Sequence, residues 1–187
     1  MLLRRQLLLT SLLALSPRGA ATADPWAALR AGACFVLLRH ATAPGTGDPP
    51  DFRLGDCSTQ RNLSADGRDQ ALRIGDLFRA NGIPQASIFS SQWCRCLETA
   101  ALLRLGPVTE QPLLNSFFGR MQGGREQTDA IRAWMASWRP ETPSVLVTHQ
   151  VNVTGLTSII PASGDLVFTA FDAGGEITVI SRQSAGA

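Results

Sequence analysis

The chain contains two histidines, and each follows an apolar run with the character of a strand. His40 follows residues 34–38 and Arg39, and His149 follows residues 144–148. Ligands of α/β sheets bind at the carboxyl ends of the strands. Two imidazoles at that edge, one of them beside an arginine, predict an anion site that contains a nucleophile. The alternative is two unrelated histidines, one of them a buried and hydrogen-bonded core residue.

A third strand-like run leads to another arginine. Residues 86–90 have the pattern of a short strand, and a helix that begins at residue 91 or 92 places Arg95 in its first turn. Transfer of a phosphoryl group needs cationic donors around its oxygens and a nucleophile in line with the leaving oxygen. Arginine supplies a fixed fork of donors, a neutral imidazole can attack phosphorus, and a protonated imidazole can donate to the oxygens. We therefore interpret Arg39, His40, Arg95 and His149 as a phosphoryl-transfer site, with surface salt bridges as the alternative for the two arginines.

Helical and strand-like segments alternate along the chain. The expected helices cover residues 24–33, 64–80, 91–103 and 126–138, and the expected strands cover 34–38, 86–90, 107–114, 144–148, 164–171 and 176–181. This order predicts one α/β domain, built as three α/β/α layers around a mostly parallel central sheet. Residues 41–62 are rich in glycine, proline and aspartate, which predicts a long loop directly after His40.

Two of the expected helices have clear sequence patterns. Ser64 is a good N-cap for the helix over 64–80. The helix over 126–138 has an apolar stripe, which we interpret as core, formed by Ala130, Ile131, Trp134, Met135 and Trp138.

The first 23 residues have the composition of a signal peptide. A charged start at Arg4 and Arg5 precedes an apolar run over residues 7–15, and Ala21-Thr22-Ala23 is a small-residue cleavage site. We expect the mature domain to span residues 24–187 and to be periplasmic or secreted. The alternative is a disordered or membrane-anchoring N-terminus, and the apolar run is too short to span a bilayer comfortably. After cleavage we therefore expect no stable insertion into the membrane.

Charge and composition narrow the choice of partner and chemistry. The expected signal holds three of the 17 basic residues, so the mature chain has 14 basic and 15 acidic residues. This balance, without a basic run, gives no indication of a nucleic-acid partner. The sequence contains no lysine, which excludes a lysine-dependent phosphate loop and a Schiff-base lysine. Any phosphate binding must use arginine, histidine and backbone amides.

The sequence contains four cysteines but does not determine which of them, if any, form a disulfide. An exported protein can form a disulfide, and Cys57 could pair with Cys94 or with Cys96. Free cysteines packed as small apolar groups are an equally good interpretation. Cys94 and Cys96 are too close in sequence for a usual zinc pair, so we expect no metal.

Four segments resemble, in the same order, the signature segments of the histidine phosphatase superfamily, the group that includes phosphoglycerate mutases and many phosphatases. They are Leu37-Leu38-Arg39-His40-Ala41, Leu63-Ser64-Ala65-Asp66-Gly67-Arg68-Asp69-Gln70-Ala71, Ser90-Ser91-Gln92-Trp93-Cys94-Arg95-Cys96-Leu97-Glu98-Thr99-Ala100 and Val145-Leu146-Val147-Thr148-His149. The resemblance covers roughly residues 34–160. It implies that His40 becomes phosphohistidine, that Arg39, Arg95 and His149 hold the phosphoryl group, and that water then releases phosphate. We expect no cofactor, because the pocket needs no metal if protein cations supply the positive charge.

One departure from the family pattern concerns the general acid. Many relatives carry Leu-x-Glu-x-x-x-Gly after the third strand, and here Asn115 stands at the position of the glutamate. An amide cannot supply a proton, although it could still bind substrate. Either another carboxylate reaches the site, for which the candidates are Asp48, Asp56 and Glu126, or the leaving group needs little protonation. For Asp48 and Asp56 we favour the interpretation as turn residues.

The sequence therefore predicts an exported phosphatase that acts on a small phosphorylated substrate through a phosphohistidine intermediate. The alternatives are a mutase-like phosphotransferase and a non-catalytic module that binds phosphate or phosphoglycan, which the missing acid keeps open. Phe117, Phe118 and Arg120 are expected near the mouth of the site, with core packing as the alternative for the phenylalanines and a solvated charge for Arg120.

Overall fold

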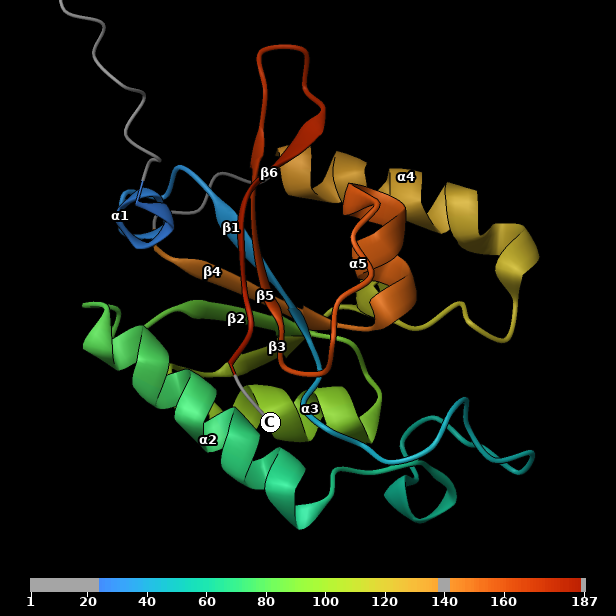
Figure 1. The fold of residues 1–187 in the computed structure, drawn as a ribbon. Helices are drawn as coiled ribbons and strands as arrows, with labels where there is room; N and C mark the ends of the chain where they lie inside the picture. The colour runs from blue at the N-terminus through green and yellow to red at the C-terminus, as the bar shows by residue number, and fades with distance from the viewer. Residues whose placement is uncertain (1–23, 138–141, 186–187) are drawn as a thin grey trace, which may run out of the picture.

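A six-stranded sheet forms the centre of the computed structural model, which describes residues 24–137 and 142–185 (Figure 1). The order across the sheet is β3-β2-β4-β1-β5-β6. The strands are β1 (Phe35–Arg39), β2 (Ser87–Ser90), β3 (Val108–Glu110), β4 (Ser144–Thr148), β5 (Leu166–Phe171) and β6 (Ile177–Gln183). The strands β1 to β4 are parallel to one another, and β5 runs antiparallel to β1 and to β6. The predicted mostly parallel sheet is confirmed, with an antiparallel hairpin at one edge.

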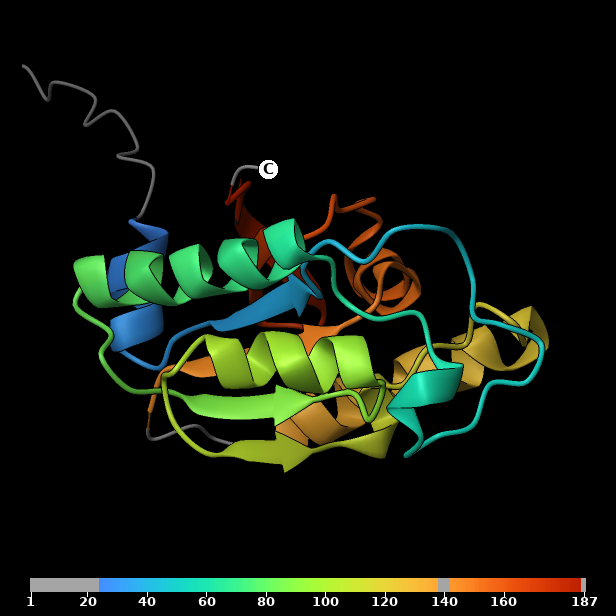
Figure 2. The ribbon, with the colours of Figure 1, turned by 90° about the horizontal axis from the view of Figure 1, so that it is seen from below.

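Helices cover both faces of the sheet (Figures 1 and 2). One face carries α1 (Pro25–Arg30), α2 (Ala65–Ala80) and α3 (Cys94–Leu102), and the other carries α4 (Gly124–Ser137) and α5 (Gln150–Thr157). Three short 3-10 turns are η1 (Cys57–Thr59), η2 (Pro112–Leu114) and η3 (Met121–Gly123). The α/β/α layering predicted from the sequence is therefore confirmed.

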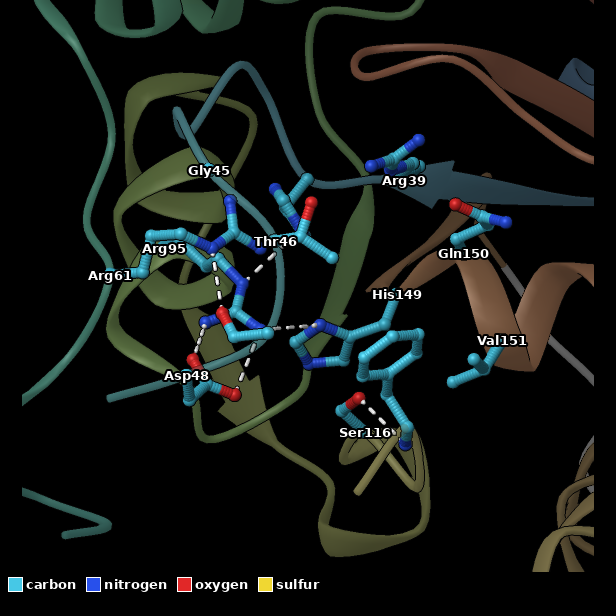
Figure 3. Close-up of a pocket in the computed structure, with 13 residues that line it drawn as sticks. Arg39, Gly45, Thr46, Asp48, Arg61, Arg95, Ser116, His149, Gln150 and Val151 are labelled. Atoms are coloured by element: carbon cyan, nitrogen blue, oxygen red, sulfur yellow. Dashed lines mark hydrogen bonds and ion pairs between the residues drawn. The ribbon is translucent and has the colours of Figure 1, made fainter. Parts of the chain in front are cut away.

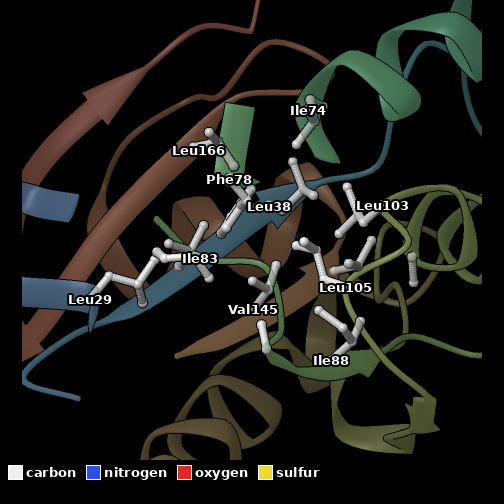
Figure 4. Packing of buried hydrophobic residues seen from close by; sticks show 14 of the residues in the cluster. Leu29, Leu38, Ile74, Phe78, Ile83, Ile88, Leu103, Leu105, Val145 and Leu166 are labelled. Carbon is white, nitrogen blue, oxygen red and sulfur yellow. The ribbon is translucent and has the colours of Figure 1, made fainter. Parts of the chain in front are cut away.

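The alternation of side chains along β1 builds two cores. Val36 and Leu38 face the cluster that includes Phe78 of α2, whereas Leu37 faces the cluster that includes Ile131 of α4. Figure 4 shows Leu38 and Phe78 in the first cluster. Successive residues of a strand point to opposite faces, so a strand covered on both sides must be apolar throughout. This explains why the runs before the two histidines contain few polar residues.

Several element boundaries differ from the predicted ones. β3 ends at Glu110 rather than residue 114, because Pro112, which has no N–H to donate to a sheet, begins η2. Helix α3 begins at Cys94, and α5 has no counterpart among the predicted helices. Ser64 caps α2 by accepting a bond from the Gly67 amide, as predicted. The expected signal peptide and Trp138 lie outside the described residues.

The parallel strands bring three chain segments to one edge of the sheet. β4 lies between β1 and β2, with Arg39 opposite Thr148 and Ser90 opposite Val147. His40, His149 and the start of α3 therefore follow three adjacent carboxyl ends. Within the described residues, none of the helices combines the length and apolar character needed to cross a bilayer.

Helix α2 packs closely against the segment after His40, and a substitution at the contact tests this packing. A Cβ atom at Gly67 would lie 2.0 Å from the carbonyl oxygen of Thr42. Alanine is the better helix former, but here the clash outweighs that gain, so we expect Gly67→Ala to lower the free energy of unfolding by about 2 kcal/mol. Gly123→Ala is the matched control, because a Cβ there meets nothing within 4 Å. Urea unfolding of both variants measures the difference, and equal stability would contradict the close packing.

Candidate active site

His40 lies directly after β1 and is buried, with 2% of its surface exposed. Its Nδ1 lies 2.8 Å from the carbonyl oxygen of Ala41, so Nδ1 carries the proton and donates it. The lone pair of Nε2 is then free to accept, and Arg95 Nε donates to it at 3.2 Å. Burial, and next the charge of Arg95, lowers the His40 pKa to about 3. The imidazole is neutral near pH 7, which is the form that can act as a nucleophile.

Two residues of the family-like segments hold the backbone after His40. The Ala41 amide donates to Thr99 Oγ1 at 3.1 Å, and the Thr42 amide donates to Gln70 Oε1 at 3.0 Å. These bonds come from α3 and α2, respectively. The glutamine and threonine of these segments therefore position the nucleophile, although neither lines the pocket.

Arg95 is the second residue of α3 and is 3% exposed. Its Nη1 lies 2.6 Å from Asp48 Oδ1, and its Nη2 lies 3.4 Å from both Asp48 Oδ2 and His149 Nδ1. Trp93 Nε1 also donates to Asp48, at 3.0 Å. Burial alone would raise the pKa of the Asp48 carboxyl, but the hydrogen bonds from Arg95 and Trp93 outweigh it and lower that pKa. Asp48 is therefore ionised near pH 7.

His149 follows β4 and is the N-cap of α5, with its ring 5.5 Å from that of His40. Its Nε2 lies 2.8 Å from Ser91 Oγ, and Ser91 in turn donates to Asn115 Oδ1 at 3.1 Å. This chain assigns the proton to Nε2 and leaves Nδ1 facing Arg95. Burial, and then the charge of neighbouring His40, holds the His149 pKa well below its ordinary value. In this structure the ring is therefore neutral, rather than the protonated donor predicted from the sequence.

Two more arginines line the pocket (Figure 3). Arg39 donates from Nη1 to the carbonyl of Pro161 at 2.8 Å, and its buried Nε has no hydrogen-bond partner among the described residues. Arg61 donates to the carbonyls of Gly47 and Ala43. Burial lowers the pKa of both guanidinium groups, yet arginine stays charged in proteins.

The pocket combines three arginines, two imidazoles and one carboxylate, so its net charge is positive. Arg39, His40, Arg95 and His149 are brought together as the sequence predicts. Sequence reasoning missed Arg61, which returns from the long loop to the pocket. The available signal was its place just before the Leu63-Ser64 segment, at the end of the predicted functional loop.

Asn115 is connected to His149 through Ser91 and does not line the pocket. Its Oδ1 accepts from the Gln92 amide at 2.8 Å as well as from Ser91, and its Nδ2 donates to Gln92 Oε1 at 3.0 Å. Because both ends of the Asn115 side-chain amide are hydrogen-bonded to the protein, the amide is not positioned to bind a substrate. Its bond with Ser91 orients that hydroxyl, which in turn contacts His149.

The structure separates the three candidate carboxylates. Asp56 caps η1 by accepting from Ser58, as a turn residue does, and Glu126 is exposed on the first turn of α4. Neither lines the pocket, whereas Asp48 does. The interpretation of Asp48 as a turn residue does not account for its contact with Arg95.

A disulfide fixes the long loop against α3. Cys57 pairs with Cys94, with 5.7 Å between their Cα atoms, and Gln60 Oε1 accepts from the Cys94 amide at 2.9 Å. This settles the pairing that the sequence left open, and Cys34 and Cys96 are free and buried. Because Arg95 follows Cys94, the bridge holds the loop that carries Asp48 and Arg61 beside Arg95. No group of three or more possible metal-ligating side chains lies together in the part of the chain that the structure describes.

Comparison with known proteins assigns the chain to a family. A family model of the histidine phosphatase superfamily (branch 1) matches residues 35–153. The chain therefore belongs to the histidine phosphatase superfamily, as the four segments indicated. No curated protein sequence matches the chain.

Solved structures with the same fold include several phosphatases. The protein histidine phosphatase SixA complexed with tungstate is 17% identical, with a TM-score of 0.59, and the match covers 81% of this chain and 97% of that one. A phosphoserine phosphatase mutant from Entamoeba histolytica in complex with phosphoserine is 13% identical, with a TM-score of 0.59 and coverage of 81% and 97%. A mycobacterial glucosyl-3-phosphoglycerate phosphatase is 18% identical, with a TM-score of 0.52 and coverage of 77% and 92%.

The lowered pKa values of the two buried histidines predict how the free energy of unfolding depends on pH. Their folded pKa values lie below the unfolded value of about 6.5, so the unfolded chain binds more protons and stability falls as pH drops below about 6.5. Each histidine contributes a loss of up to about 1.4 kcal/mol per pH unit, and carboxylates contribute little above about pH 5. His40 and His149 are the only histidines in the sequence, so an untagged protein isolates their effect.

Urea unfolding of the mature protein between pH 7 and pH 5 measures this dependence. We expect His149→Gln to remove about half of the slope, and Gln92→Ala, a nearby non-titrating change, to leave the slope intact. A free energy of unfolding that stays constant over this interval would contradict the neutral, buried state of both rings.

Proposed function

We propose that the protein is a phosphatase in which His40 Nε2 attacks phosphorus and forms a phosphohistidine intermediate. The observation that carries this proposal is the bond from His40 Nδ1 to the Ala41 carbonyl, which fixes a neutral ring with the Nε2 lone pair turned toward Arg95. A nucleophile held in one tautomer inside a cationic pocket suits attack on an anionic phosphoryl group.

The first step exchanges the partner of Arg95. An incoming phosphoryl oxygen replaces His40 Nε2 as the acceptor of the hydrogen bond from Arg95 Nε–H. The freed Nε2 lone pair then forms the bond to phosphorus. The bond from phosphorus to the leaving oxygen breaks, and its electron pair stays with the leaving group. Arg39 and Arg61 contribute further positive charge around the oxygens. The negative phosphoryl group raises the pKa of His149, so its Nδ1 takes up a proton from solvent and donates a hydrogen bond to a non-leaving phosphoryl oxygen, not to the leaving oxygen.

The second step returns the enzyme to its starting state. Water attacks phosphorus opposite Nε2, the new oxygen–phosphorus bond forms, and the bond to Nε2 breaks with its electron pair returning to His40. Asp48 accepts a proton from the attacking water and releases it to solvent as phosphate leaves, which restores the carboxylate. Its lowered pKa suits a base better than an acid, because an ionised carboxylate has no proton to donate to the leaving group.

The named neighbours and the cysteine pairing support the wider proposal. One neighbour was solved with tungstate and another with phosphoserine, so this fold holds oxyanions and phosphate esters elsewhere. The protein acts after export, in the periplasm or outside the cell. The signal-like residues 1–23 and the Cys57–Cys94 disulfide support this location, since disulfides persist in oxidising compartments.

A non-catalytic phosphate-binding module is the second candidate, and Asn115 in place of an acid is the observation that favours it. Incubation with a 32P-labelled phosphate ester, followed by rapid quenching, distinguishes the two. We expect acid-labile label on the wild-type protein and none on His40→Ala, with Val179→Ala as an exposed control outside the pocket lining. Tight phosphate binding with no label at all would identify the module instead.

The role of Asp48 predicts a change in the rate-limiting step. Asp48→Asn removes the base for the second step, so we expect phosphohistidine to accumulate and steady-state turnover to fall about 10²-fold or more. Asp56→Asn is the matched control and should behave as wild type. Single-turnover labelling measures formation and decay separately. Decay at the wild-type rate in Asp48→Asn would rule out the proposed base.

A further inference from the structure

A groove leads out of the phosphoryl pocket toward the segment after Asn115. Asp48, Ser116 and Phe118 line both the pocket and this groove, so the two spaces are continuous (Figure 3 shows Asp48 and Ser116 at the pocket). The groove continues past Phe52, Trp93, Gly119 and Arg120. It lies where the part of a substrate beyond the phosphoryl group would extend.

The walls of the groove are aromatic. Phe52 and Trp93 stack with their ring centres 5.0 Å apart and their planes 20° apart. The bond from Trp93 to Asp48 fixes this pair relative to the pocket. Phe118 also lines the groove, and 54% of its surface is exposed. Flat apolar surfaces of this kind suit a ring, which can stack on them or meet them edge to face.

The outer end of the groove is positively charged. Arg120 is exposed, and its guanidinium makes no ion pair with any described residue. Among the described residues that line the groove, Asp48 is the only carboxylate, and Arg95 neutralises it. An anionic group at the far end of a bound ligand would therefore meet an unpaired cation.

The polar groups near the leaving oxygen restrict the leaving group further. Asp48 is ionised, and Asn115 is committed to Ser91 and Gln92. Neither can protonate an alkoxide, so alcohols and sugars, which form very basic alkoxides, are poor leaving groups here. A phenol forms a much weaker base and can depart as the anion. Sugars also stack on aromatic side chains, and it is the missing acid that disfavours them.

We propose that the substrate is an aryl phosphate whose ring lies in this groove and carries a second anionic group that contacts Arg120. This proposal rests on the phosphatase function proposed above. In the first step the bond from phosphorus to the aryl oxygen breaks, the aryl oxygen keeps the electron pair, and the aryloxide takes a proton from solvent after release. Phe118 and Arg120 are then specificity-determining residues.

Kinetics on a matched series of esters tests the assignment. Phenyl phosphate supplies the ring, 4-carboxyphenyl phosphate adds the second charge, cyclohexyl phosphate keeps a ring but forms a basic alkoxide, and ribose 5-phosphate represents sugars. We expect kcat/KM to be highest for 4-carboxyphenyl phosphate and lowest for the last two. Ribose 5-phosphate or cyclohexyl phosphate turned over as fast as phenyl phosphate would overturn the proposal.

Substitutions in the groove test whether its residues cause the expected preference for aryl esters. We expect Arg120→Gln to raise KM about three- to fivefold for 4-carboxyphenyl phosphate, with kcat unchanged and no effect on phenyl phosphate. Phe118→Ala should lower kcat/KM about fivefold for both aryl esters. Arg125→Gln and Met121→Ala are the controls, because both residues are exposed and neither lines the groove. Equal effects of test and control variants would refute the groove while leaving the phosphatase function intact.

A binding measurement covers the case in which no ester is hydrolysed and the phosphatase proposal itself fails. Calorimetry on the His40→Ala protein compares 4-carboxybenzylphosphonate with benzylphosphonate and methylphosphonate, none of which can be hydrolysed. We expect affinity to fall in that order and Arg120→Gln to weaken only the carboxylated compound. Equal affinity for all three would reject the groove as a ligand site.

Discussion

The buried guanidinium of Arg95 contacts both imidazoles and the carboxylate of Asp48. A buried charge is costly unless it is paired and hydrogen-bonded, so Arg95 requires the loop that delivers Asp48. Burial is the largest cause of the low His40 pKa; the same guanidinium lowers it further and also lowers the pKa of Asp48. One side chain therefore helps to keep the proposed nucleophile neutral and the proposed base ionised, and it also supplies the donor that an incoming phosphoryl group would use.

The rest of the fold keeps this arrangement in place. Three adjacent parallel strands end at the same edge and deliver His40, His149 and the start of α3. The Cys57–Cys94 bridge and the bond from Cys94 to Gln60 hold the loop against α3. Gln70 and Thr99 fix the backbone after His40 from the neighbouring helices. The conformation of the pocket is thus determined by secondary structure, by a covalent link and by side-chain bonds to backbone groups.

The parts of the site that follow strands were predictable from sequence. An apolar run covered on both faces is recognisable from its composition, and the residue after it must lie at the sheet edge, so Arg39, His40 and His149 could be placed. The first turn of α3 placed Arg95 in the same way. The three-layer fold followed from the alternation of helical and strand-like segments.

The contribution of the long loop was not predictable. Residues 41–62 have no apolar periodicity, so nothing local indicates which of their side chains turn inward, and Asp48 and Arg61 were missed or undervalued. Pairing of Cys57 with Cys94 rather than Cys96 depends on which thiol faces the loop at the start of α3. Asn115 was recognised as a departure from the family pattern, but its bonds to Ser91 and Gln92 are tertiary contacts that only the folded chain reveals.

The claim that His40 attacks through Nε2 can be tested on the trapped intermediate by 31P NMR and mass spectrometry. The bond from Nδ1 to the Ala41 carbonyl leaves only Nε2 able to attack, so the account predicts a single phosphorylated histidine, His40, modified at Nε2. Phosphorus on Nδ1 of that ring, on His149, or on any other side chain would contradict it.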